Sequence, residues 1–540
     1  MQRLRMILGM KTNPHSKYDV IIVGSGINSL VCAAMLARCK RSVLVLEREA
    51  IFGGCIRSDE LTLPGFVHDT LATAFPLFVS GPAYAELGEA LRAEGLEFST
   101  SASSIGVLLP DGSHTLLSNK RDENLARFER LAVGDGAAFS MAMEQLQRHE
   151  KLIFPLLGNE LWRVSTACSL SLHVLKSGMH STSSFLGESM MSCRHWLDGA
   201  VQSPALRALL APWTLHAGLG PDSAMSALMT KVISSMLESV GLPQVRGGSK
   251  GLIEALVAVI SKAGGSLEHG ADVSRVLVRR GRAHGVILAS GRRIEACDVV
   301  CNVTPTQLYG ELLEPQHVPK EVLEESKSYR YGKGNMQIHL ALSEPVRWPV
   351  AELDGATYIH LCDGPDSISR AINEADRGLL PAEPTICISQ PTIHDPSRAP
   401  AGRAILWIQL PACPRTVRGD AAGLIQVPAD GRWTDSLKES YADRVLEQIA
   451  RQLPGIRTSI LARHVLSPAD LEGLNANLVG GDPYGGSCEM DQSMLWRPLR
   501  ATRNHATPVA HLWHIGASTH PGPGVGGVSG FHVAKALGAR

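Results

Sequence analysis

Two apolar runs with a helical pattern between them predict the first regular elements of the chain. Residues 18–23 are almost continuously apolar, as in a parallel strand that is covered on both faces. Apolar side chains then recur at helical spacing from Leu30 to Ala37, and residues 42–46 form a second apolar run. This order of strand, helix and strand predicts a βαβ unit, so we expect the α/β fold class here.

The remainder of the chain mixes helical and strand-like patterns. At 540 residues it is too long for one ordinary core, so we expect two domains and an α+β organisation overall. The expected order is a mainly helical region at 82–242 with a strand-like piece at 105–109, short strands with tight turns at 271–300, further strands between 331 and 411, a helix around 438–452, and a glycine cluster at 514–528 before a last helix.

A glycine turn between the first strand and the first helix suits a pyrophosphate. Gly24 permits the tight turn. Gly26 lets a pyrophosphate approach the amides at the helix start, where the helix dipole favours negative charge. Ser29 stands where a third glycine is usual, which is a small change because that position mainly allows close packing of helix and strand.

An acidic residue ends the second strand. Glu47 follows the glycines by about 20 residues, where a carboxylate accepts the protons of both ribose hydroxyls and disfavours the extra phosphate of NADP. Gly53 and Gly54 come soon after it. An ordinary glycine turn is the alternative interpretation of the glycines alone. Strand, turn, helix, strand and acid in this order predict an FAD adenosine site in a Rossmann-type domain.

Charge and cysteine usage exclude several classes of partner. Fifty-two basic residues balance fifty-two acidic ones, so there is no electrostatic case for nucleic acid or for an acidic membrane surface. Eleven cysteines without a CxxC motif indicate a reducing compartment, and we expect a cytoplasmic protein. No HxxxH or HxH spacing occurs, so no metal site is expected.

The chain also gives expectations about membranes and targeting. No apolar run reaches the roughly 18 residues of a membrane span, which leaves at most peripheral membrane contact. Residues 1–9 contain two arginines and a short apolar patch that is too brief for a signal peptide. They either precede a true start at Met10 or form a weak targeting segment.

Four regions of the chain, at residues 19–54, 247–256, 296–305 and 513–530, carry a resemblance to a known family. The chain resembles the phytoene desaturase-like flavoproteins of the glutathione-reductase-type and amine-oxidase-like FAD superfamily, and among them the branch that includes pyridine nucleotide-disulphide oxidoreductase domain-containing protein 2. This resemblance implies a discontinuous FAD-binding domain with a substrate domain of sheet and helices woven between its segments. The implied division is an FAD-binding domain at 18–81, 243–325 and 500–540, a helical substrate or lid region at 82–242, and a substrate domain at 326–499.

By match of motif, the resemblance also implies a set of FAD contacts. They are Gly24, Gly26, Asn28 and Ser29 at the pyrophosphate, Glu47 at the ribose, Gly53 and Gly54 beside the phosphates, Val273 at the adenine, Gly516 and Ala517 at the phosphate and ribityl chain, and Gly526, Gly527 and Val528 at the flavin, with Ile27, Arg48 and Cys55 as further members of the cofactor site. The residues at the flavin place a helix N-terminus at its N1 and C2 carbonyl, where the positive end of the dipole favours acceptance of hydride at N5. Cys55 stands where arginine or alanine is common. A covalent link to the flavin is one interpretation of it, and an ordinary buried thiol is the preferred one.

Three side chains are candidates for a catalytic acid or base. His68 and Asp69 lie near the expected cofactor rim, and His520 lies in the C-terminal glycine loop. Each has a structural alternative, because His68 or Asp69 could brace the rim and His520 could shape its loop.

The substrate is expected to be hydrophobic. Met225, Leu228, Met229, Val232 and Met236 recur at helical spacing, as plain core or as the wall of an apolar tunnel. Only 5% of the residues are aromatic, which disfavours an aromatic cage for an amine. We therefore expect an FAD-dependent oxidoreductase that desaturates a carbon-carbon bond of a hydrophobic small molecule by hydride transfer to flavin N5.

Other activities stay open at this point. The alternatives are a redox-neutral isomerase or hydratase that uses reduced FAD, an amine oxidase, and a non-catalytic flavin-binding assembly protein. The electron acceptor, whether oxygen, quinone or another, and the oligomeric state are also open, and an oligomer is possible.

Overall fold

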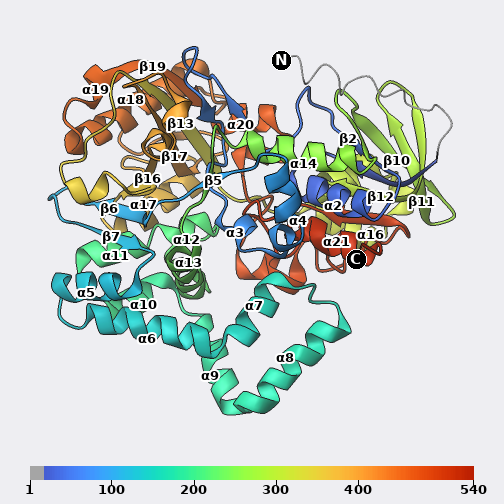
Figure 1. Cartoon of the computed structure of the whole chain (residues 1–540), viewed down its shortest axis with the longest axis horizontal. Helices are drawn as coiled ribbons and strands as arrows, with labels where there is room; N and C mark the ends of the chain where they lie inside the picture. The colour runs from blue at the N-terminus through green and yellow to red at the C-terminus, as the bar shows by residue number, and fades with distance from the viewer. Residues whose placement is uncertain (1–16, 540) are drawn as a thin grey trace.

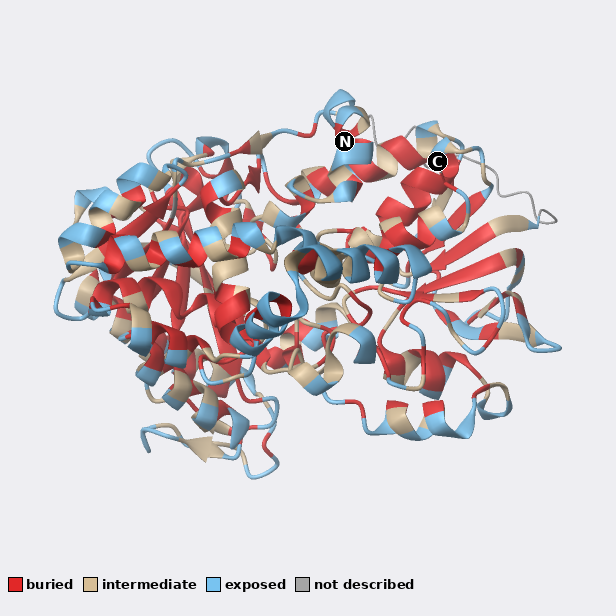
Figure 2. Ribbon diagram, turned by 90° about the horizontal axis from the view of Figure 1, so that it is seen from below, coloured by how far each residue is buried: buried red, intermediate tan, exposed pale blue. Residues whose placement is uncertain are grey.

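The computed structural model describes residues 17–539, so the alternatives for residues 1–9 lie outside it. Figure 1 shows two bodies, each built on a large sheet, with a group of helices beside them. Figure 2 shows that both sheets are buried and that exposed residues lie mainly on outer helices and loops.

The first body contains a seven-stranded sheet in the order β10-β11-β12-β1-β2-β9, with β20 paired to β12. Its strands are β1 (Tyr18–Val23), β2 (Val43–Leu46), β9 (Ser266–Glu268), β10 (Val273–Arg279), β11 (Arg282–Leu288), β12 (Arg293–Asn302) and β20 (Leu512–Ile515).

Strand β1 lies at the centre of this sheet. Ile22 is paired in parallel with Val45 of β2 on one side and with Val300 of β12 on the other. Strand β12 in turn pairs in parallel with β20, which comes from the end of the chain. Segments from the start, the middle and the end of the sequence therefore share one sheet, as a discontinuous domain requires.

Four helices form the core against this sheet. They are α2 (Ile27–Arg38), α4 (Pro82–Ala93), α14 (Lys250–Lys262) and α21 (Val528–Ala536). Helix α21 approaches α2 so closely that a Cβ on Gly530 would lie 1.8 Å from the Asn28 carbonyl oxygen. The C-terminal glycines therefore allow the last helix to lie against the first.

The second body contains another seven-stranded sheet, in the order β19-β13-β17-β16-β14-β6-β7. Its strands are β6 (Ser103–Leu108), β7 (His114–Ser118), β13 (Gly334–Leu342), β14 (Tyr358–Leu361), β16 (Ile386–Ser389), β17 (Ala404–Cys413) and β19 (Ile460–Leu466). Helix α18 (Asp435–Gln452) packs on one face, where Tyr441 and Leu446 join the apolar side chains of β13 and β17.

The group of helices connects the two bodies and borders the second sheet. Its members are α3 (Pro76–Val79), α5 (Arg121–Leu131), α6 (Asp135–Arg148), α7 (Glu150–Gly158), α8 (Val164–Ser177), α9 (Met179–Ser189), α10 (Cys193–Ala200), α11 (Pro204–Leu210), α12 (Trp213–His216) and α13 (Ser226–Val240). Helices α8 and α9 project away from the rest of the molecule in Figure 1.

Shorter elements complete the fold. The short strands are β3 (Ser58–Asp59), β4 (His68–Asp69), β5 (Phe98–Ser99), β8 (Gln244–Val245), β15 (Leu379–Leu380) and β18 (Gly419–Asp420). The remaining α-helices are α15 (Pro305–Gln307), α16 (Lys320–Lys327), α17 (Pro365–Asp376), α19 (Ile456–Ser459) and α20 (Pro468–Leu474). Within residues 17–539, no helix combines the length and the apolar character that crossing a bilayer requires.

The structure confirms the predicted α/β class and the βαβ unit at the start of the chain. Two features add to the predicted division of the chain. Strand β6, from the mainly helical region, joins the second sheet by parallel pairing with β14. Helix α4 begins at the implied boundary at residue 82, and its Leu87 and Leu91 lie in the core of the first body. The two bodies therefore interlock through this segment.

Candidate functional site

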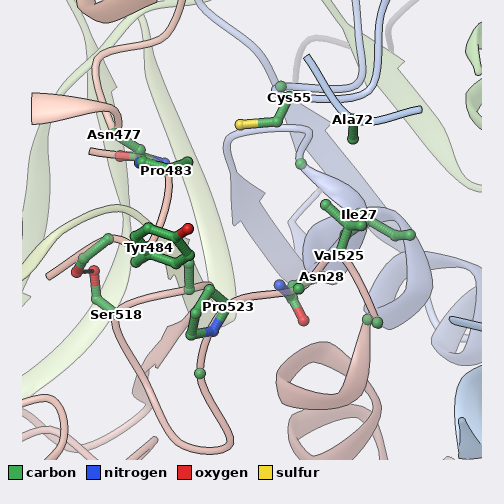
Figure 3. Close-up of a pocket in the computed structure, with 18 of the residues that line it drawn as sticks. Ile27, Asn28, Cys55, Ala72, Asn477, Pro483, Tyr484, Ser518, Pro523 and Val525 are labelled. Atoms are coloured by element: carbon green, nitrogen blue, oxygen red, sulfur yellow. Dashed lines mark hydrogen bonds between the residues drawn. The ribbon is translucent and has the colours of Figure 1, made fainter. Parts of the chain in front are cut away.

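A large cavity lies between the two bodies, and Figure 3 shows part of its lining. Its volume is about 1520 Å³, more than the roughly 300–1,000 Å³ typical of a pocket for one small ligand. The wall includes the glycine turn after β1, the start of α21, and residues of α13 and β13. The cavity therefore has room for a long cofactor and a second molecule.

The glycine turn lies at the carboxyl edge of the first sheet, where open α/β sheets bind their ligands. Gly24 has a φ of +85°, which favours glycine, and a Cβ on Gly26 would lie 3.0 Å from Asn302 Nδ2. A Cβ on Gly54 would lie 3.3 Å from Gly26 Cα. The glycines therefore keep the amides at the start of α2 accessible to a pyrophosphate.

The Glu47 carboxylate is held in place at the end of β2. Its Oε2 accepts hydrogen bonds from the Ser25 amide at 2.8 Å and the Ser25 hydroxyl at 2.6 Å. Its Oε1 accepts from the Glu49 amide at 2.9 Å. These donors fix the carboxylate at the cavity wall, where its remaining lone pairs suit ribose hydroxyls.

Asn302 is a residue of this site that sequence reasoning missed. It ends β12, and its Nδ2 donates to the Ser29 hydroxyl at 3.0 Å, so the serine in the third glycine position has a buried partner. Its carbonyl oxygen accepts from Asn477 Nδ2 at 2.9 Å, which ties the second body to the turn. The signal for it was its place at the end of an apolar strand, inside one of the four regions of resemblance.

The C-terminal glycines reach the same cavity from the opposite side of the turn. Ala517, Gly526 and Gly527 line it, and helix α21 begins there at Val528. Gly527 has a φ of +72°, and a Cβ on it would lie 2.7 Å from Val31 of α2. The N-terminus of α21 therefore lies at the cavity wall, with the dipole orientation that stabilises negative charge.

Most of the implied FAD contacts line this one cavity. Ser29 and Gly516 lie behind its surface, and the others are Gly24, Gly26, Ile27, Asn28, Glu47, Arg48, Gly53, Gly54, Cys55, Val273, Ala517, Gly526, Gly527 and Val528. Figure 3 shows Ile27, Asn28 and Cys55 across the pocket from Tyr484 and Ser518. A glycine cradle, an oriented carboxylate and a helix N-terminus together fit FAD.

Cys55 lies at the cavity as a neutral thiol. Burial raises its pKa to about 11, and Asn475 Nδ2 donates to its sulphur at 3.4 Å. A thiol with this pKa is a poor nucleophile at neutral pH. The contacts therefore support the ordinary buried thiol.

His68 and Asp69 belong to a buried network and do not line the cavity among the described residues. Asp69 accepts from Arg398 Nη1 at 2.6 Å and from the Ser249 amide at 2.7 Å. Arg398 is fully buried, and it also donates to Asp395 and to the Val245 carbonyl. These contacts support the bracing alternative for Asp69.

His520 lies in the cavity wall. Its backbone amide donates to Asn504 Oδ1 at 2.8 Å, while its Nε2 has no hydrogen-bond partner within residues 17–539. Burial lowers its pKa to about 3, so its imidazole is neutral at physiological pH. A neutral imidazole at the wall can accept or donate one hydrogen bond but cannot serve as a resident acid.

The part of the wall formed by helices is apolar. Met229 and Met236 of the predicted methionine stripe line it, together with Phe154 and Leu157 of α7. The second sheet adds Trp407 and Tyr358, whose rings stack with centroids 5.6 Å apart. The stripe therefore forms part of a cavity wall and suits an apolar ligand.

The fold also assembles a histidine pair that the spacing along the chain did not reveal. His216 Nε2 and His360 Nε2 lie 3.0 Å apart, near the Cys387 thiol. The two rings share a hydrogen bond, so they satisfy each other without a bound ion. His216 lines the cavity, and burial lowers its pKa to about 4.

This nucleotide cradle, joined to an apolar chamber, defines an FAD-dependent oxidoreductase. The chain belongs to the flavin-containing amine oxidoreductase family, whose model matches residues 30–510. The putrescine oxidase structure with bound putrescine shares the fold, with a TM-score of 0.60 and 15% identity over 97% of this chain and 100% of that one.

Curated relatives extend over nearly the whole chain. Pyridine nucleotide-disulfide oxidoreductase domain-containing protein 2 of Rattus norvegicus is 26% identical over 96% of this chain and 93% of its own. A limonene dehydrogenase protein of Castellaniella defragrans is 25% identical, covering 96% and 94%. The same holds for the neurosporene-forming phytoene desaturase of Cereibacter sphaeroides, and prolycopene isomerase of Daucus carota is 26% identical, covering 94% and 78%. These relatives confirm the resemblance to phytoene desaturase-like flavoproteins.

Replacing Glu47 by Ala should weaken FAD binding. Hydrogen bonds to a charged group contribute about 1.5–3 kcal/mol, so the dissociation constant for FAD should rise roughly 10- to 100-fold. Flavin absorbance after gel filtration measures retention, and Glu89→Ala, at an exposed position on α4, is the matched control. Full retention of FAD by Glu47→Ala would remove this carboxylate from the ribose site.

The buried histidines predict steep loss of stability in acid. Burial lowers the pKa of His68, His216, His514 and His532 to about 4. The unfolded chain binds these protons from about pH 6.5 downward while the folded chain does not, so unfolding free energy falls as pH drops from about 6.5 to about 4.

Each such histidine should contribute about 1.4 kcal/mol per pH unit in this window. Urea unfolding at several pH values measures the slope. His532→Gln should reduce it by about that amount, while His180→Gln, at an exposed position, should leave it unchanged. Equal slopes for His532→Gln and the parent would contradict this origin of the acid sensitivity.

Proposed function

We propose that this protein desaturates a carbon-carbon bond of a hydrophobic small molecule. The observation that carries the proposal is the continuity of the cavity from the start of α21 to the apolar side chains of α7 and α13. Relatives named as a limonene dehydrogenase and a phytoene desaturase support it. FAD, when bound, supplies the acceptor for the hydride that leaves the substrate carbon.

The residues of the chain contribute placement and water exclusion. The apolar helices hold the substrate, and the N-terminus of α21 favours negative charge at the end of the cradle. His520, neutral and with a free Nε2 among the described residues, is positioned to take one hydrogen bond at the wall. Closing this chamber to water protects the reacting carbon atoms from side reactions.

The charge of the wall argues against an amine substrate. The carboxylates at the cavity are Glu47, Glu49, Asp272 and Glu311 of the first body, and Glu472, which is exposed. The second sheet offers no carboxylate to the cavity among the described lining residues. An ammonium group buried there would lack a counter-ion.

A redox-neutral reaction is the second candidate, because one relative is named as a prolycopene isomerase. An isomerase or hydratase would act only after reduction of its flavin and would leave it reduced. A non-catalytic flavin-binding assembly protein would show no turnover in either state.

Anaerobic mixing with hydrophobic compounds separates these functions. We expect that a substrate bleaches the oxidised flavin absorbance without air and yields a product with one more double bond, identified by mass spectrometry. Product that forms only after dithionite reduction would favour the redox-neutral reaction. An absence of product in both states, across alicyclic and polyene compounds, would contradict desaturation.

We further propose that α8 and α9 rest on a lipid bilayer, which is the source of the substrate. Lys176 is the only formally charged side chain from Val164 to Gly187, although 19% of the whole chain is charged. Val164, Leu175 and Met179 are 79%, 81% and 75% exposed. Phe154 at the end of α7 is both exposed and part of the cavity wall, so the cavity opens beside this surface.

Replacing Leu175 by Glu should weaken binding to vesicles of phosphatidylcholine. Burial of a leucine side chain contributes about 1.5–3 kcal/mol, so the partition coefficient should fall at least roughly tenfold. Leu424→Glu, at a site 82% exposed outside the projecting helices, should leave vesicle binding unchanged. Equal binding by both variants, or a dimer in solution that Leu175→Glu dissociates, would contradict the bilayer as the partner.

A further inference from the structure

Strand β13 has one apolar and one polar face although all its residues are buried. Met336, Ile338 and Leu340 pack into the core with α18. Asn335 and Gln337 alternate with them and therefore lie on the opposite face, toward the cavity that they line. A polar face on a fully buried strand serves something other than water.

The two carboxamides on this face are desolvated and unpaired. Asn335 is 1% exposed and Gln337 is 0% exposed. Neither the nitrogen nor the oxygen of either side chain has a hydrogen-bond partner among residues 17–539. Buried polar groups are nearly always hydrogen-bonded in native proteins, and leaving them unpaired costs free energy. Four such atoms on one face therefore indicate a ligand.

A third carboxamide lies beside them. Gln409 of β17 is directly opposite Gln337 in the antiparallel ladder, and it also lines the cavity. We call Asn335, Gln337 and Gln409 the carboxamide patch. The neighbouring wall residues Trp407 and Tyr358 are aromatic, so the patch is a polar spot in a mainly apolar chamber. A few polar groups in an apolar pocket typically fix the orientation of the ligand.

We propose that the carboxamide patch binds an oxygen atom of the substrate, in a carbonyl or hydroxyl group. The amide N–H groups donate to that oxygen, and a hydroxyl can also donate to an amide oxygen. The inference rests on the proposed function, in which the chamber holds an apolar small molecule. It adds that this molecule is oxygenated, because a site built for a hydrogen bond rejects the analogue that lacks the group.

Matched pairs of probes test the proposal on the FAD-loaded protein. The probes are limonene and its ketone carvone, and dodecane and dodecan-2-one. Titration of each, followed by the change in flavin absorbance, measures its dissociation constant. We expect at least one ketone to bind at least roughly tenfold more tightly than its hydrocarbon.

The variant Gln337→Met should abolish this preference, because methionine has a similar length and no hydrogen-bonding amide. Gln316→Met, at an exposed position, is the matched control and should keep it. Without a ligand, Gln337→Met should unfold at an equal or higher temperature than the parent, since it removes a desolvated amide. A lower unfolding temperature would indicate a structural role for Gln337.

Three results would overturn the inference in different ways. Equal binding of ketone and hydrocarbon, or an unchanged preference in Gln337→Met, would contradict the carboxamide patch alone. A changed flavin spectrum in ligand-free Gln337→Met would assign the patch to the flavin. Failure of every probe to bind would contradict the proposed function itself.

Discussion

The parallel pairing of β1 with β2 and β12 is the constraint on which the site depends. It places the ends of three strands at one edge of the sheet, so that Gly24, Glu47 and Asn302 come together from distant parts of the sequence. The hydrogen bonds from Ser25 to Glu47 and from Asn302 to Ser29 then fix the turn and the carboxylate relative to each other. A shift of either strand by one residue would turn these side chains to the other face of the sheet.

The second body depends on the same edge for its position. Asn477 donates to the carbonyl of Asn302, and the buried Arg398 joins Asp69 of the first segment to Asp395. A buried charge of this kind is costly unless it is fully paired, so the network specifies one relative placement of these segments. The cavity between the bodies follows from that placement, with a nucleotide cradle at one end and an apolar chamber at the other.

Local patterns were sufficient to predict the cradle. The apolar run at 18–23, the glycines after it and the acid at Glu47 are contiguous in sequence, and each has its own physical requirement. The partners of these residues were not predictable, because Asn302 and Arg398 reach them only through tertiary pairing. The carboxamide patch was readable in principle from the alternation of Asn335 and Gln337 with Met336 and Ile338. The face that this alternation lines required the position of β13 within the second sheet.

The central claim is that the cradle between the two bodies holds FAD in an oxidoreductase. The most direct measurement is the absorption spectrum of the purified protein before and after dithionite, with the flavin released by denaturation quantified against protein. The account predicts equimolar FAD, with bands that differ from those of free flavin and disappear on reduction. A protein that contains no flavin, and acquires none on incubation with excess FAD, would contradict it.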